Sequence, residues 1–187
     1  MLGSKSDAPE LTRVVKARLL PASAVLIEAD ERERVALAER FGVVSIEKLT
    51  AEVALDLCKK GVRAEGHLRA EITQACAVSG EDFPVSIAEP IALRFIEAGS
   101  LTLNPSEDDE IDFDLTPEDC DEIEYPGDSF DLGEAVAQTL GLAIDPYAEG
   151  PKAAAARQAA GIVEEGQQDG PLSAGLAAGL AGLKKRS

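Results

Sequence analysis

Three cysteines and one histidine are the side chains of this chain best suited to nucleophilic or metal chemistry. Cys58, Cys76 and Cys120 are widely spaced, and none belongs to a C-x-x-C pair. His67 has no ligand-like neighbour at motif spacing, so the sequence offers no four-ligand zinc site. An odd number of separated cysteines is typical of a reducing compartment. We therefore expect no metal site and no catalytic cysteine or histidine.

Carboxylates are abundant between residues 107 and 128, but their surroundings do not suit acid–base or metal chemistry. They lie in a run that we interpret as a flexible loop, whereas paired carboxylates and hard-metal sites need fixed geometry. The chain also lacks a phosphate-binding glycine loop and a Gly-x-Ser-x-Gly elbow. The sequence therefore predicts a protein that is not an enzyme, with no cofactor and no small-molecule substrate.

Charge is distributed unevenly along the 187 residues, whose formal net charge is −17. Residues 1–70 are nearly balanced, whereas residues 71–151 hold 21 acidic residues against the single base Arg94. Such a segment repels phosphate and attracts chains rich in Lys and Arg. The candidate contacts for a basic protein are Glu107, Asp108, Asp109, Glu110, Asp112 and Asp114. A solvated loop without a partner is the alternative interpretation of this run.

Basic side chains on ordered elements are the candidates for an RNA contact. Aromatic platforms that stack unpaired bases are nearly missing, since the chain has five Phe, two Tyr and no Trp. Glu65 and Glu71 interrupt the strand face on which His67 lies. The possible RNA-binding residues are Arg13, Lys16, Arg18, Lys59, Lys60, Arg63 and Arg69. Ordinary surface charge is the alternative for each of them.

The elements that must position these side chains begin with two strands and a helix. Apolar alternation predicts strands over Leu11–Leu19 and Ala24–Ala29. Asp30 and Glu33 have the spacing of a capping box for a helix over Glu31–Phe41, and a glycine follows its end. Three further strands are predicted over 49–57, 62–76 and 83–95, the second of them half-buried with one charged face.

The motif Asp131-Leu132-Gly133-Glu134 has the spacing of a helix N-terminus. Asp131 can accept the backbone N–H three residues on, and Glu134 can reach back to the N–H of Asp131. The predicted helix covers Leu132–Ile144, and Pro146 stops it. The predicted fold class is therefore α+β: an antiparallel β-meander sheet with two packed helices, a long acidic loop and a flexible C-terminal tail.

The predicted organisation is a disordered N-terminus (1–10), one domain (11–150) and a low-complexity tail rich in Ala and Gly (151–187). In the tail, four leucines at helical spacing between Leu172 and Leu183 are weakened as a helix by glycines. No apolar run approaches the roughly 20 residues that a membrane span needs, and the N-terminus lacks the apolar stretch of a signal peptide. We therefore expect a cytoplasmic protein that does not contact membrane.

Three segments together resemble the YceD family, named for accumulation of the large ribosomal RNA subunit. They are Val62–Pro90 with its cysteine turn, Asp121–Pro146 with the Asp-Leu-Gly-Glu helix, and Gly170–Lys185 with a small-residue terminal motif. Many relatives carry C-x-x-C at the turn, where this chain has Cys76 followed by Ser79, so we interpret the turn as structural. The family-motif residues with expected structural roles are Cys76, Asp131, Leu132, Gly133, Glu134 and Pro146.

The resemblance implies a YceD-like domain over 11–150 and a non-enzymatic role in the accumulation or maturation of large-subunit (23S) ribosomal RNA. The family name favours contact with a large-subunit rRNA precursor, whereas the charge distribution favours contact with a basic ribosomal protein, and either or both are the expected partners. The alternative is a general protein-interaction adaptor that docks through its acidic loop and its C-terminal segment. No catalytic residue follows from the resemblance.

Overall fold

The computed structural model describes residues 10–59, 61–99 and 121–162. The chain divides into two compact units, which are described separately. The first unit contains the described residues up to Gln74 together with Asp82–Pro146. The second unit contains Ala75–Glu81 and the described residues from Tyr147 onward. The domain boundaries predicted at residues 10 and 150 stay predictions.

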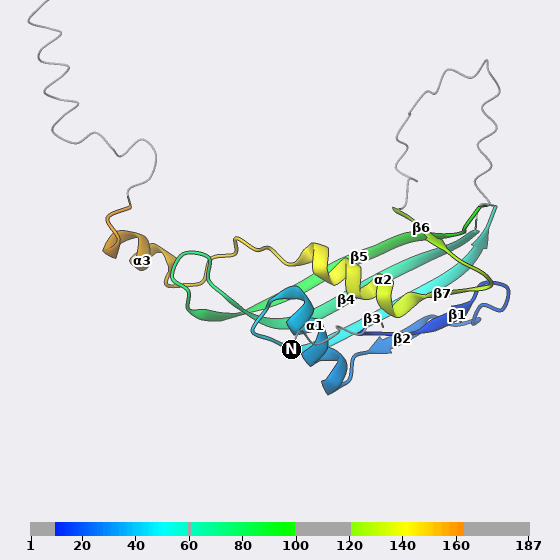
Figure 1. Ribbon diagram of the computed structural model, residues 1–187, viewed down its shortest axis with the longest axis horizontal. Coiled ribbons are helices and arrows are strands. Elements are labelled where there is room, and N and C mark those ends of the chain that lie inside the picture. The colour runs from blue at the N-terminus through cyan, green and yellow to red at the C-terminus, as the bar shows by residue number, and fades with distance from the viewer. Residues whose placement is uncertain (1–9, 60, 100–120, 163–187) are drawn as a thin grey trace, which may run out of the picture. The chain divides into compact units, whose positions relative to one another are not determined.

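A five-stranded sheet in the order β2-β3-β4-β5-β6 forms the first unit, beside a two-stranded sheet of β1 and β7 (Figure 1). The strands are β1 Val14–Lys16, β2 Val25–Glu28, β3 Ser45–Cys58, β4 Gly61–Ala75, β5 Asp82–Glu97, β6 Asp121–Tyr125 and β7 Ser129–Asp131. Strand β3 is antiparallel to β2 and β4, and β1 is antiparallel to β7. The predicted α+β class is confirmed.

Strand β6 differs from the predicted antiparallel meander because it runs parallel to β5. It lies in the acidic stretch that we predicted to be a loop. Its side chains alternate as a half-buried strand requires: Ile123 packs against the core and Tyr125 is buried, while Glu122 and Glu124 are exposed. A parallel neighbour needs a long connection, and residues 98–120 provide one. The sheet is therefore mixed.

Strand β1 is shorter than the predicted Leu11–Leu19. Its pairing with β7 covers three residues, after which the N–H of Leu19 bonds back to the carbonyl of Lys16 at 3.0 Å. Leu19 consequently lies outside the strand and is exposed, although the apolar alternation predicted a strand that extends to it. Leu11 is fully buried, but the backbone N–H of Arg13 bonds to a side chain instead of a strand. Local turn formation therefore overrides the alternation here.

Helix α1 (Glu31–Phe41) is confirmed with its predicted bounds and caps. The Asp30 carboxylate accepts the Glu33 N–H at 2.9 Å, and the Glu33 carboxylate accepts the Asp30 N–H at 2.8 Å. Gly42 follows the helix with φ of 68°, the left-handed conformation that glycine adopts without steric cost. The capping box and the terminal glycine together fix where this helix begins and ends.

Helix α2 (Leu132–Ala143) ends one residue before the predicted boundary. Helix α3 (Ala153–Ala159) belongs to the second unit and was not predicted, because it lies in the segment interpreted as a low-complexity tail. Within that unit, Lys152 bonds to Glu81 at 3.0 Å, and Arg157 pairs with Glu149. The beginning of the predicted tail is therefore helical, and the remainder, residues 163–187, lies outside the described residues.

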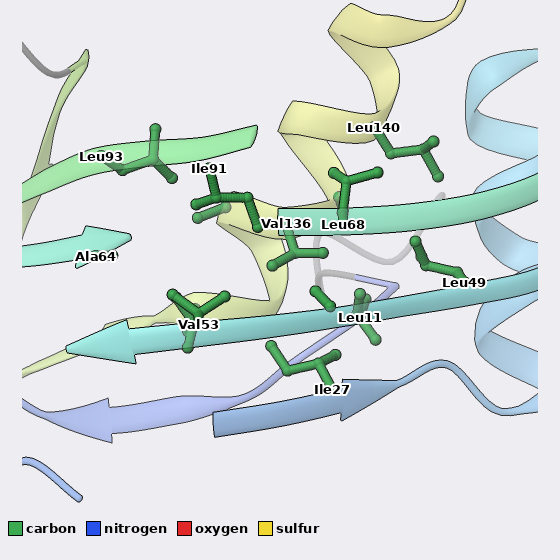
Figure 2. Packing of buried hydrophobic residues seen from close by; sticks show 14 of the residues in the cluster. Leu11, Ile27, Leu49, Val53, Ala64, Leu68, Ile91, Leu93, Val136 and Leu140 are labelled. Atoms are coloured by element: carbon green, nitrogen blue, oxygen red, sulfur yellow. The ribbon is translucent and has the colours of Figure 1, made fainter. Parts of the chain in front are cut away.

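Buried aliphatic side chains form one apolar cluster in the first unit. Figure 2 shows Val136 and Leu140 of α2 gathered with Leu49 of β3 and Leu68 of β4. Helix α1 adds Leu37, which is also fully buried. The opposite side chains of β4 are exposed or half-buried, with His67 among the exposed ones, so the prediction of a half-buried strand with one charged face is confirmed. The helices leave that charged face uncovered.

Candidate functional site

The start of α2 is tied to the N-terminal strand through Asp131. Its Oδ1 atom accepts the backbone N–H of Gly133 at 2.9 Å and of Glu134 at 3.2 Å. The same oxygen accepts the N–H of Arg13 at 2.7 Å, while the N–H of Leu132 donates to the carbonyl of Arg13 at 3.0 Å. Asp131 therefore acts as the predicted N-cap and also joins β1 to α2.

The second predicted contact of the α2 capping box, from the Glu134 carboxylate to the backbone N–H of Asp131, is wrong. The Glu134 carboxylate does not reach back to Asp131 but binds the Arg40 guanidinium in a bidentate pair at 2.8 and 2.9 Å. Arg40 also donates to Glu10 at 2.9 Å. A charge-assisted bidentate bond is stronger than a bond to one backbone N–H, which explains the preference. Glu134 thus connects α2 to α1.

We expect Glu134→Gln to reduce stability by about 1 kcal/mol or less at low salt, with a smaller loss at high salt. Arg40 holds the pKa of Glu134 below its ordinary value of 4.5. The carboxylate therefore stabilises the fold above that value, and the contribution is lost as the pH falls through the lower folded pKa. The difference in urea midpoint between wild type and variant should shrink below about pH 4.5.

Glu39→Gln is the matched control for this prediction, because Glu39 is an exposed carboxylate on α1. It changes the net charge equally without touching the Arg40 pair. A pH-independent difference between wild type and Glu134→Gln would contradict the ion-pair assignment.

The predicted RNA-binding residues do not form one continuous basic face in the described structure. Arg13 is held by Glu33 at 2.7 Å, next to α1. Arg63 lies opposite Asp56 across the β3–β4 pair and 3.5 Å from Glu65. Arg69 shares the charged sheet face, and Lys59 is exposed in the turn that joins β3 to β4. Lys16 and Arg18 are exposed on and just after β1. Lys60 lies outside the described residues.

The six predicted protein-contact carboxylates lie outside the described residues. The described acidic residues closest to them in sequence are Asp121, Glu122 and Glu124 on β6, all exposed. Glu122 accepts a bond from Arg94 at 2.9 Å, and this pair links β6 to β5. Acidic charge therefore continues from the undescribed segment onto an ordered strand.

A cavity of about 410 Å³ lies at the end of β6, within the first unit. Its aromatic lining includes stacked rings of Phe95 and Phe130, with centroids 4.0 Å apart, and the tilted ring of Tyr125. The lining residues are Val14, Phe95, Ile123, Glu124, Tyr125, Pro126, Ser129, Phe130, Asp131, Glu134, Ala135 and Gln138. Every charged residue among them is acidic. No sequence pattern predicts this cavity, because its walls come from four separate segments.

Cys76 lies at the turn that was predicted to be structural, and it is buried at 3% exposure. Its Sγ atom accepts the backbone N–H of Val78 at 3.4 Å and of Ser79 at 3.3 Å. The Ser79 hydroxyl, these N–H groups and that of Gly150 lower the pKa of the thiol to about 7. All of these groups belong to the second unit. The serine that replaces the second cysteine thus becomes a donor to the first.

We expect a variant with Cys58→Ala and Cys120→Ala to show thiolate absorbance that titrates with a midpoint of about 7. Adding Ser79→Ala should raise the midpoint, because the thiolate loses its main donor. The lowered pKa also implies that thiolate stabilisation is present above pH 9 and is lost as the pH falls through 7. A midpoint of 9 in both variants would exclude the hydrogen-bonded thiolate.

Metal and membrane signals are absent from the described part of the chain. No group of three or more His, Cys, Asp or Glu side chains is placed to hold a metal ion among residues 10–59, 61–99 and 121–162. In those same ranges, no helix has the length and apolar character needed to cross a membrane. Pro146, the last family-motif residue, lies just after α2, as expected.

The fold defines the class of this protein: an α+β protein built on an open, mostly antiparallel sheet with one charged face. The chain belongs to the YceD family, because the family described as "Large ribosomal RNA subunit accumulation protein YceD" matches residues 64–184. Comparison with curated proteins and with solved structures gave no match. The resemblance found in the sequence is confirmed, and the family name implies a role in accumulation of large-subunit ribosomal RNA.

Proposed function

We propose that this protein is a non-enzymatic, cytoplasmic factor that supports accumulation or maturation of 23S ribosomal RNA by contacting a basic ribosomal protein. Membership of the YceD family supports the ribosomal context. The acidic charge of residues 71–151 supports contact with a basic protein, since this segment contains 21 acidic residues and one basic residue. A segment of this charge attracts Lys/Arg-rich chains and repels phosphate.

Direct RNA binding has weaker support in the described structure. Phosphate recognition needs basic side chains that are close together and unopposed. Here Arg13 is neutralised by Glu33, and Arg63 lies between Asp56 and Glu65. The charged face of β4 is therefore mixed in sign, which favours a protein partner over RNA.

A pull-down at two salt concentrations, with ribosomal RNA intact or digested, tests the proposal. We expect basic ribosomal proteins to remain bound after RNase treatment at low salt and to be released at high salt, because screening weakens exposed ionic contacts. Loss of all ribosomal material after RNase treatment would favour the RNA route. Recovery of only non-ribosomal proteins would favour a general interaction adaptor.

A further inference from the structure

The cavity at the end of β6 presents hydrogen-bond acceptors that the fold does not use. Asp131 uses Oδ1 for its three backbone N–H bonds, so Oδ2 has no donor among the described residues. Gln138 donates its amide group to Glu134 at 3.1 Å, which leaves its amide oxygen without a described donor. Glu124 is exposed and has no described partner, whereas Glu134 is already paired with Arg40. The cavity therefore suits a ligand rich in donors.

Tyr125 adds an accessible hydroxyl group to the lining of this cavity. Its residue is only 7% exposed and lines the cavity, yet its hydroxyl makes no hydrogen bond to any described residue. The hydroxyl is not among the fully buried side-chain atoms that lack a partner, so it remains accessible to solvent or to a ligand. Burial also raises the pKa of this hydroxyl, which keeps it protonated and neutral. It can accept a hydrogen bond from a cationic ligand.

We propose that this cavity binds an arginine side chain of a basic protein partner. The guanidinium carries a positive charge and five N–H donors in a planar fork, which match the acceptors of Asp131, Gln138 and Tyr125. The methylene stem of an arginine packs on apolar surface while its head stays polar, and Phe130 supplies such surface. All three charged lining residues are acidic, so the site complements a cation. This inference rests on the proposed function and adds an ordered contact for the same class of partner.

The test is an NMR titration of the full chain with N-acetyl-arginine-N-methylamide. This probe carries one arginine, and the isosteric citrulline compound is its neutral control. We expect saturable shifts of the Gln138 side-chain amide and of the backbone amides of Ser129 and Phe130. Citrulline should produce no saturable shift. Lysine should bind more weakly because it lacks the planar fork.

Val14→Arg and Leu26→Arg form a matched pair of variants for the titration. Each replaces an exposed apolar strand residue, 64% and 76% exposed respectively, by a cation, but only Val14 lines the cavity. We expect Val14→Arg to weaken binding of the probe about fivefold or more through like-charge repulsion. Leu26→Arg should bind the probe with an affinity close to that of wild type. Equal binding by both variants, or shifts that do not saturate at the cavity, would overturn the proposal.

Failure of the site and failure of the proposed function give different results. An absent probe response together with reduced large-subunit rRNA after depletion would overturn the arginine site and leave the ribosomal role standing. Saturable, Val14-dependent binding together with unchanged rRNA would support the site and contradict the ribosomal role.

Discussion

Replacing Gly133 by alanine should lower the free energy of unfolding by about 3 kcal/mol, although alanine is normally the better helix former by about 1 kcal/mol. A Cβ atom at Gly133 would lie 2.6 Å from the carbonyl oxygen of Leu11 and 2.7 Å from the backbone nitrogen of Arg13. Both are backbone atoms of the segment that Asp131 holds against α2, so neither can move without breaking that anchor. The clash therefore outweighs the helix propensity.

Gly141→Ala is the matched control because it makes the same change in the same helix. Its new Cβ atom would meet the ring of Phe41 at 2.8 Å, but a partly buried ring can rotate aside. We expect its urea midpoint to stay close to that of wild type. An equally small change in the urea midpoint of Gly133→Ala would contradict the close approach of α2 to the N-terminal segment.

Neutralising the six acidic residues at the start of the acidic run should have the largest effect on partner binding. The variant carries Gln or Asn at Glu107, Asp108, Asp109, Glu110, Asp112 and Asp114. We expect retention of basic ribosomal proteins after RNase treatment to fall about tenfold at low salt, since several exposed ionic contacts of a few tenths of a kcal/mol each are lost. The far-ultraviolet circular dichroism should match that of wild type.

The comparison variant removes basic side chains instead, with Lys59→Gln, Arg63→Gln and Arg69→Gln. If the protein contacts a basic ribosomal protein, this variant should still retain ribosomal proteins, because its net charge is even more negative. Loss of binding in this variant, with retention in the acidic-run variant, would reverse the assignment in favour of RNA.

The helices were predictable because their signals are local. Asp30 and Glu33 lie three residues apart and cap each other, so a sequence pattern contains the whole interaction. Asp131 has the same spacing to Glu134, yet Glu134 binds Arg40, which is 94 residues away. Sequence spacing identified the N-cap but contained no information about the competing arginine.

The parallel strand and the cavity depend on contacts that no local pattern encodes. The alternation of Ile123 and Tyr125 with glutamates was a strand signal, but the surrounding acidic residues favoured the loop interpretation. Its partner β5 is reached across a long connection, and the cavity wall combines β1, β6, β7 and α2 with Phe95 of β5. The surroundings of Cys76 were only partly predictable. Its turn was predicted from the sequence, whereas the hydrogen bonds that it receives from Ser79 and Gly150 are visible only in the structure.

Profiling of ribosomal RNA after depletion of this protein shows whether large-subunit rRNA depends on it. The proposed function predicts a lower ratio of mature large-subunit to small-subunit rRNA, with large-subunit precursors accumulating. Wild-type protein supplied in trans should restore the ratio, and the acidic-run variant should not. An unchanged ratio and precursor profile in depleted cells would contradict the proposed ribosomal function.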